Sequence, residues 1–172
     1  MFYFAYGSNM LRARLEQRVG AVSVVGAGRV PAYQLRFHKR SVDGSGKCNL
    51  LYTGRLIDNA HGVVYAMRLS QRVQLDKYEG RSYEAQTVIV QVGSRHVRAL
   101  TYIARPEHIE EGMSPYDWYH AFVLAGAREH GLDPRHIEAI ANTHVQRDPN
   151  MQRAIQNERL LRFAATKLNN SH

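Results

Sequence analysis

The chain has 172 residues, of which 44% are hydrophobic and 22% are charged, and its formal net charge at pH 7 is +8. These values predict one globular domain over residues 1–172 and exclude disordered and fibrous proteins. Cys48 is the single cysteine, and no apolar run has the length of a membrane span or the position of a secretory signal. We therefore expect a cytoplasmic protein that has no disulfide and does not bind membranes.

The chain begins with the pattern of a short buried strand at residues 2–6, which is rich in aromatic residues and ends at the turn residue Gly7. A helix is predicted to follow over residues 10–19, with Ser8 or Asn9 as its N-cap. We expect arginines on its outer face and, on its apolar face, Leu11, Leu15 and Val19. Such a junction directs backbone N–H groups into a small space that suits a carboxylate or phosphate, although an ordinary turn has the same pattern.

Further strands are predicted at residues 21–25, 33–37, 49–57, 63–69, 85–92 and 97–104. The segments that separate them are turn-like, notably residues 43–46, 58–62 and 93–94. A short helix is expected between Leu69 and Tyr83, with Ser70 as its cap and Gly80 at its end. Many strands at short spacing favour a curved sheet or barrel over repeated βαβ units.

Helices are predicted throughout the C-terminal part of the chain. Ser114 as a cap and Pro115 at the first helical position indicate a helix that runs to Gly131. Residues 133–134 start another helix, and residues 151–167 form a final amphipathic one. The predicted fold class is therefore α+β, with an N-terminal mixed barrel-like sheet and C-terminal helices packed against it.

Three segments of the chain support a more specific interpretation. The first is Tyr6-Gly7-Ser8-Asn9-Met10, and the second is residues 75–80, followed by Tyr83 and the strand-like residues 87–90. The third comprises Ser114, Pro115, Tyr119, Gly126, Ala127, Gly131 and Leu132. In this order and at these separations the segments resemble the gamma-glutamylcyclotransferase family, from Phe2 to about Leu132. The resemblance implies the α+β fold of that family and an enzyme that converts a gamma-glutamyl compound into 5-oxoproline and a free amine.

Glu79 matches the catalytic glutamate of the family, and the resemblance implies that it is the general acid and base. Because the substrate's own amino nitrogen is the nucleophile in this cyclisation, no metal, cofactor or covalent intermediate is expected. Glu79 also lies in the last turn of a predicted helix, where the carbonyl ends oppose its charge, so its pKa should be raised. The alternative is a solvated glutamate that precedes a helix-ending glycine.

The resemblance further implies a set of substrate-binding residues, namely Tyr6, Gly7, Ser8, Asn9, Tyr83 and Tyr102. The first four would hold the substrate's carboxylate or carbonyl through backbone N–H groups. The two later tyrosines would complete the pocket, although strand tyrosines are also common as packing residues. The substrate is expected to be a gamma-glutamyl amino acid or amine, or alternatively a larger biosynthetic amine that carries a gamma-glutamyl group. Glutathione-specific relatives have leucine in place of Asn9, which argues against glutathione.

The positive charge is concentrated near the N-terminus. Before Asp43 the single acid is Glu16, against the cations Arg12, Arg14, Arg18, Arg29, Arg36, Lys39 and Arg40. This charge can promote solubility, attract an acidic substrate or bind nucleic acid; without a recognition motif, specific nucleic-acid binding is not expected. Neither the histidines nor Cys48 has the spacing of a metal site. A non-enzymatic basic binding protein is the alternative to an enzyme, and the oligomeric state stays open.

Overall fold

A closed barrel of five strands forms the centre of the fold, in the order β1-β5-β2-β6-β7. The computed structural model describes residues 1–169, with side chains to residue 166. The barrel strands are β1 (Phe2–Ala5), β2 (Ser23–Pro31), β5 (Asn59–Ala66), β6 (Tyr83–Val92) and β7 (Arg95–Ala104). β1 closes the barrel because it pairs antiparallel with β5 and parallel with β7. The predicted mixed, barrel-like sheet is thus confirmed.

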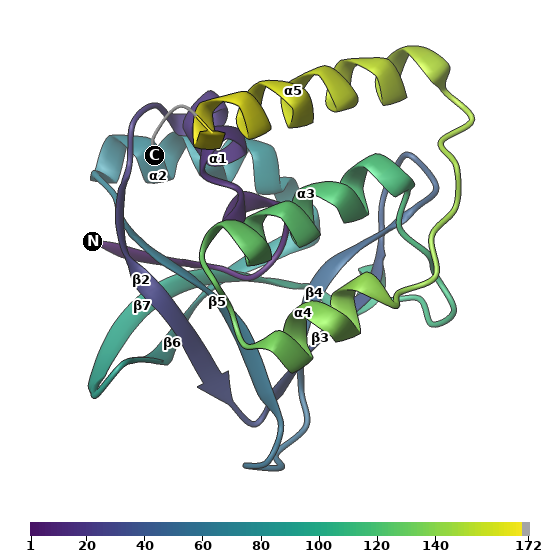
Figure 1. The fold of residues 1–172 in the computed structure, drawn as a ribbon. Helices are drawn as coiled ribbons and strands as arrows, with labels where there is room; N and C mark the ends of the chain where they lie inside the picture. Colours follow the sequence, from purple (N-terminus) through teal and green to yellow (C-terminus); the bar gives the residue numbers. More distant parts are fainter. Residues whose placement is uncertain (170–172) are drawn as a thin grey trace.

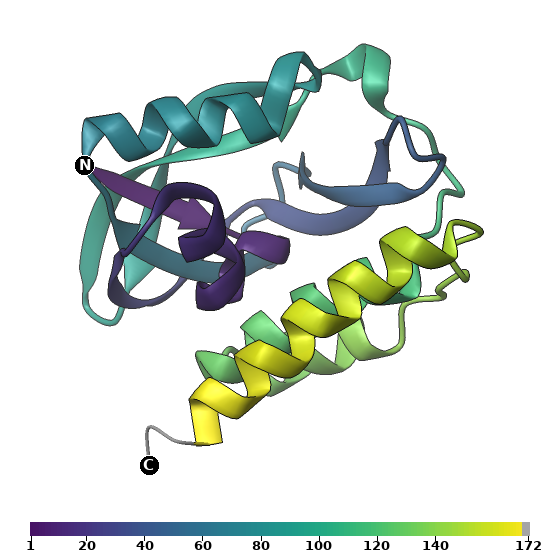
Figure 2. The ribbon, with the colours of Figure 1, turned by 90° about the horizontal axis from the view of Figure 1, so that it is seen from above.

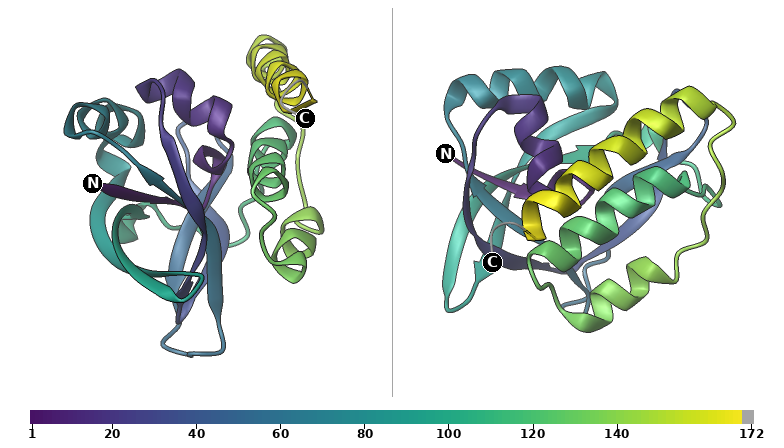
Figure 3. Two further views of the ribbon diagram at one scale, coloured as in Figure 1. Left: turned by 60° about the vertical axis from the view of Figure 1, so that its left-hand side comes forward. Right: turned by 45° about the horizontal axis from the view of Figure 1, so that its top comes forward.

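Helices cover the barrel on more than one side. They are α1 (Arg12–Val19), α2 (Leu69–Glu79), α3 (Asp117–Glu129), α4 (Pro134–Ala141) and α5 (Met151–Asn169), with short 3-10 helices η1 (Ser8–Met10), η2 (Gly80–Ser82) and η3 (Pro106–His108). Helices α3, α4 and α5 gather in one layer (Figure 1), and α2 lies on the far side of the barrel from them (Figure 2). α1 lies between these helices (Figure 3) and contacts both α2 and α5. Within the described residues, no helix is long and apolar enough to cross a membrane.

The core joins the barrel to helices α1 and α3. The predicted apolar face of α1 is buried as expected, and the largest buried side chains around it include Phe4, Tyr65 and Phe122. Gly126 brings α3 close to the chain that leaves β1, because a Cβ there would lie only 2.4 Å from the backbone nitrogen of Leu11. Helix α3 and the segment after β1 are therefore in backbone contact, which a larger residue would prevent.

Two strands lie outside the barrel and form a two-stranded sheet with each other, β3 (Tyr33–Arg40) and β4 (Gly46–Tyr52). The turn between them is held by Lys47, whose Nζ donates to Asp43 Oδ2 and to Ser45 Oγ, each at 2.8 Å. The same ammonium lies 4.6 Å from the ring centre of Trp118 and 4.5 Å from that of Tyr119. These contacts fix the β3–β4 hairpin against the start of α3.

The predicted caps of three helices are wrong. Ser8 and Asn9 form η1 instead, in which Met10 N donates to Gly7 O at 2.9 Å, and α1 begins one turn later after Leu11. Their side chains make no capping bond, because Ser8 accepts from Arg14 and Asn9 binds Glu79, as described below.

Ser70 also does not cap a helix, since α2 begins at Leu69. Arg68 is the N-cap there, and its backbone N donates to Gln71 Oε1 at 2.8 Å.

Likewise Ser114 does not start α3, which begins at Asp117. The carbonyl of Ser114 instead accepts bonds from the backbone N of Gly46 and the side-chain amide of Gln146, so the loop is held by tertiary contacts.

Several strand boundaries also differ from the prediction. The predicted strand at 49–57 ends at Tyr52, and most of the predicted turn at 58–62 belongs to β5, which begins at Asn59. The turn lies at residues 53–58, where the guanidinium of Arg55 binds Asp58 through two contacts of 2.9 Å. β2 begins at Ser23 and extends well past the predicted 21–25, because it pairs with β5 along its length.

Candidate active site

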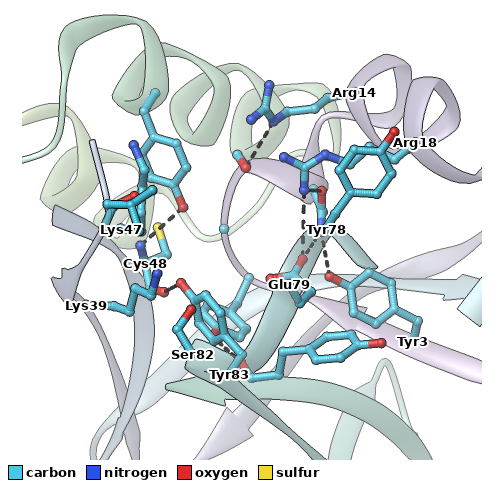
Figure 4. Close-up of a pocket in the computed structure, with 18 of the residues that line it drawn as sticks. Tyr3, Arg14, Arg18, Lys39, Lys47, Cys48, Tyr78, Glu79, Ser82 and Tyr83 are labelled. Atoms are coloured by element: carbon cyan, nitrogen blue, oxygen red, sulfur yellow. Dashed lines mark hydrogen bonds and ion pairs between the residues drawn. The ribbon is translucent and has the colours of Figure 1, made fainter. Parts of the chain in front are cut away.

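The residues predicted from the sequence converge on one cavity of about 280 Å³ (Figure 4). Its wall contains every predicted site residue, namely Tyr6, Gly7, Ser8, Asn9, Glu79, Tyr83 and Tyr102. They come from the end of β1 and the turn after it, the end of α2, the start of β6 and the last part of β7. Because the barrel brings these segments together, residues that are up to 96 positions apart face the same space.

Because Gly7 has no side chain, the backbone that follows β1 can pack closely against the β3–β4 hairpin. A Cβ at this position would lie 2.9 Å from Cys48 Cβ and 3.5 Å from the hydroxyl of Tyr119. The next residues, Ser8 and Asn9, are buried and are the first two residues of the 3-10 turn η1. The first N–H groups of such a turn have no hydrogen-bond partner within it. Gly7, Ser8 and Asn9 all line the cavity, so the junction has the geometry that favours an anion or a polarised carbonyl.

The side chain of Asn9 connects this junction to Glu79. Its Nδ2 donates to Glu79 Oε1 and to the hydroxyl of Tyr3, each at 3.0 Å. Its Oδ1 accepts from Nη1 of Arg18 at 2.9 Å. The amide therefore uses both donors and its acceptor within the protein, which fixes the Glu79 carboxylate in one orientation.

Glu79 is the one acid among the described residues that line the cavity. Its side chain is 14% exposed, and Nη1 of Arg18 lies 3.8 Å from Oε1. Burial raises the pKa of Glu79, whereas Arg18, the bond from Asn9 and Lys39 act in the opposite direction. The predicted rise in the pKa is therefore present, with burial as its main cause, and the carboxylate lies in an environment that suits both taking up and giving back a proton.

The three predicted tyrosines contribute to the cavity wall while their hydroxyls bind elsewhere in the protein. Tyr6 donates to the backbone carbonyl of Tyr102. Tyr83 donates to the carbonyl of Cys48 at 2.7 Å, and the hydroxyl of Tyr102 donates to Asp76 Oδ1 at 2.5 Å. Burial raises the pKa of each phenol, so all three stay protonated at neutral pH. These hydroxyls brace the wall by joining separate strands and helices.

Four cations in the cavity wall were not predicted as site residues: Arg14, Arg18, Lys39 and Lys47. The expectation that the arginines of α1 lie on its outer face is wrong for Arg14, which is buried. Its guanidinium donates to Ser8 Oγ at 3.1 Å and lies 4.1 Å from the ring centre of Phe122. The signal for Arg14, Arg18 and Lys39 was the excess of cations before Asp43, of which substrate attraction was one interpretation, whereas Lys47 follows Asp43 and had no such signal.

Cys48 lies in the same wall, but its thiol is buried and its pKa is raised to about 12 by that burial. Such a thiol is a poor nucleophile at neutral pH. Among the described residues, no cluster of three or more histidine, cysteine, aspartate or glutamate side chains could hold a metal ion. The chemistry available in the cavity is therefore that of one buried carboxylate and several cations, beside the turn that begins at Ser8.

Known proteins that are similar to this chain belong to the family that its sequence resembles. The family model described as "Gamma-glutamyl cyclotransferase, AIG2-like" matches residues 3–120. The chain is 27% identical over 146 residues to the human gamma-glutamylcyclotransferase, a match that covers 80% of this chain and 76% of that protein. It is 28% identical over 138 residues to the bovine one, covering 76% and 71%.

A solved structure described as a gamma-glutamyl cyclotransferase has the same fold, with a TM-score of 0.77 and 24% sequence identity. The match covers 85% of this chain and 89% of that one. The matched family model includes the junction after β1, the cations of α1 and β3, and the Glu79 segment. The chain therefore belongs to the gamma-glutamyl cyclotransferase, AIG2-like family of enzymes.

Proposed function

We propose that the protein cyclises the gamma-glutamyl group of an amino acid or amine to 5-oxoproline and releases the free amine. The α-amino nitrogen of the substrate attacks its γ-carbonyl carbon, a C–N bond forms, and the bond to the leaving nitrogen breaks. Protons move from the attacking nitrogen to the leaving nitrogen, so neither water nor an oxidant is consumed. The enzyme has to fold the glutamyl arm into a near-ring and relay the protons.

Glu79 is the residue that we assign to the proton relay. The observation that carries the proposal is its position as the one acid among the described cavity residues, buried and oriented by Asn9. An ionised Glu79 would accept a proton from the substrate's ammonium and return it to the leaving amine. The rise of its pKa brings its acidic and basic forms closer in energy near neutral pH, which supports both steps.

The junction after β1 is assigned to substrate positioning. The N–H groups at the start of η1 would donate hydrogen bonds to the α-carboxylate or to the developing oxyanion at the γ-carbon. Arg14 supports this role, because its bond to Ser8 Oγ leaves the Ser8 hydroxyl proton free to donate into the cavity. Tyr6, Tyr83 and Tyr102 supply the rigid rings between which the glutamyl arm would lie.

The direct test is to incubate the protein with gamma-glutamyl dipeptides and gamma-glutamyl amines and to quantify 5-oxoproline and the released amine by mass spectrometry. We expect the two products in equal amounts. The isomeric α-glutamyl dipeptides are the control. They should give neither product, since their γ-carboxyl group is free and is not in an amide bond to the amine. Absence of 5-oxoproline from every gamma-glutamyl compound would contradict the proposed function.

A further inference from the structure

The cavity wall formed by β3 carries a cation whose ammonium makes no direct polar contact. Lys39 is only 7% exposed, and among the described residues its Nζ has neither a hydrogen-bond nor an ion-pair partner. Its ammonium lies 5.0 Å from the ring centre of Tyr83, and the charges of Glu79 and Asp43 act on it only from a distance. A largely buried ammonium without a contacting anion is costly for a fold, and a bound anion would remove that cost.

We propose that Lys39 determines which leaving amines are accepted, by binding a carboxylate that the leaving amine carries. This inference rests on the function proposed above and assigns a preference within it. The favoured substrates are gamma-glutamyl compounds whose leaving amine is itself an acid, such as an amino acid. Neutral amines and polyamines are disfavoured.

The nearest comparison is Lys47 on the neighbouring strand β4. Its ammonium is already neutralised, because it binds Asp43 and Ser45 and lies among the rings at the start of α3. Lys47 therefore has a structural role in the hairpin, whereas Lys39 has no such partner. Of the two lysines in the wall, Lys39 is the one available to a ligand.

The remaining cations of the cavity lie on a different wall. Arg14 and Arg18 belong to α1 and sit beside Ser8 and Asn9, to which they donate hydrogen bonds. Figure 4 shows Lys39 across the cavity from these arginines and from Glu79. The glutamyl carboxylate thus has partners at the junction after β1, and Lys39 is left for a second anion.

The position of Lys39 identifies which part of the substrate that anion belongs to. Ser41 and Val42 follow Lys39 in the chain, line the same cavity, and include a fully exposed side chain at Val42. Tyr78, near the end of α2, also lines the cavity and is exposed, so the mouth of the cavity lies between the hairpin and α2, with Lys39 on the hairpin side. The glutamyl arm has to stay between Glu79 and the junction to cyclise, so the part that faces the mouth is the leaving amine.

The test uses a matched pair of substrates, gamma-glutamyl-alanine and gamma-glutamyl-ethylamide, which differ only by the carboxylate on the leaving amine. For the wild type we expect kcat/KM for the alanine compound to exceed that for the ethylamide by about 10- to 100-fold. Lys39→Met should remove this ratio, whereas Lys39→Arg should retain most of it. Lys39 also lowers the pKa of Glu79, so Lys39→Met alters proton transfer for both substrates alike. The ratio of the two kcat/KM values cancels that effect.

The matched control is Arg40→Met, which removes the same charge from an exposed side chain that pairs with Glu110 on the surface. It should leave the ratio unchanged. An equal fall for both substrates in Lys39→Met would overturn the inference, since Lys39 would then serve the glutamyl arm or Glu79.

Binding of the same two compounds to Glu79→Gln, with and without Lys39→Met, separates this inference from the proposed function. A calorimetric preference for the alanine compound that depends on Lys39 supports the inference even if the wild type gives no 5-oxoproline. If neither compound binds, the inference fails together with the function.

Discussion

Asn9 Nδ2 donates to Glu79 Oε1 at 3.0 Å, which links the turn after β1 to the end of α2 across 70 residues of sequence. The same amide holds the hydroxyl of Tyr3 and accepts from Arg18, so the carboxylate is oriented by a side chain that is itself fixed on three sides. Such support reduces the rearrangement that a proton relay requires at the moment of reaction.

Replacing Glu79 by glutamine should lower kcat by about 100-fold or more, because the amide keeps the shape of the side chain but cannot relay a proton. Substrate Kd should change little, and circular dichroism should show an intact fold. Glu84→Gln is the matched control in the same segment, since Glu84 is half exposed and only 3.9 Å from Arg105 on the surface. Near-normal turnover of a folded Glu79→Gln protein would contradict the mechanism and direct attention to Glu84.

The stability of the protein should depend on pH through Glu79. Burial raises its pKa in the folded state above the unfolded value of about 4.3, so the fold favours the neutral acid. This contribution is fully present below the unfolded pKa and is lost as the pH rises through the folded pKa. Urea unfolding across this range should therefore show the wild type losing stability relative to Glu79→Gln as the pH increases. A difference that moves in the other direction would mean that the carboxylate is stabilised as an anion.

Asn9→Ala should move the acidic limb of the kcat/KM profile to higher pH, because the bond from Asn9 is one of the contacts that lower the pKa of Glu79. Loss of this charge-assisted bond should also reduce kcat/KM by about 10-fold at neutral pH. Full pH profiles of the variant and the wild type give both values. Ser8→Ala removes a neighbouring polar group with no bond to Glu79 and should leave the position of the limb unchanged. An unshifted limb in Asn9→Ala would show that this amide does not control the carboxylate.

Gly7→Ala should reduce the free energy of unfolding by about 1–3 kcal/mol, since the added methyl group meets Cys48 Cβ at 2.9 Å. Cys48→Gly removes that atom and the sulfur at 3.4 Å, so the double variant should lose less stability than the sum of the two single changes. Urea unfolding of the four proteins measures this coupling. If the stability losses of the two single variants add in the double variant, then the backbone conformation of Gly7, and not its contact with Cys48 of β4, excludes a side chain at this position.

Turnover should be unchanged after dialysis against a chelator, because the proposed mechanism uses only side chains and backbone groups of the cavity. The measurement is the rate of 5-oxoproline formation before and after treatment, with metal content checked by mass spectrometry. A loss that a divalent ion restores would disprove a mechanism free of metal.

The sequence predicted the parts of the site that depend on local patterns. The strand that ends at Gly7 and the helix that ends near Glu79 are recognisable from turn and cap residues, and both meet in the cavity as expected. Arg14 was assigned to the wrong face, because the buried side of α1 depends on how α3 packs against η1, which brings the ring of Phe122 under the Arg14 guanidinium. Lys39 could not be placed either, since the pairing of β3 with β4 outside the barrel is a tertiary outcome.

The hairpin of β3 and β4 is joined to the barrel by loops and packing and shares no ladder with it among the described strands. Glu79 and the turn after β1 belong to the barrel side of the cavity, whereas Lys39 belongs to the hairpin. A substitution in the hairpin can therefore change the charge presented to an incoming amine without disturbing the strands that position the carboxylate. With the role proposed for Lys39, the residue that selects the leaving amine and the strands that position Glu79 lie on separate structural elements, so a family with this architecture can vary its substrates while keeping the framework of the reaction.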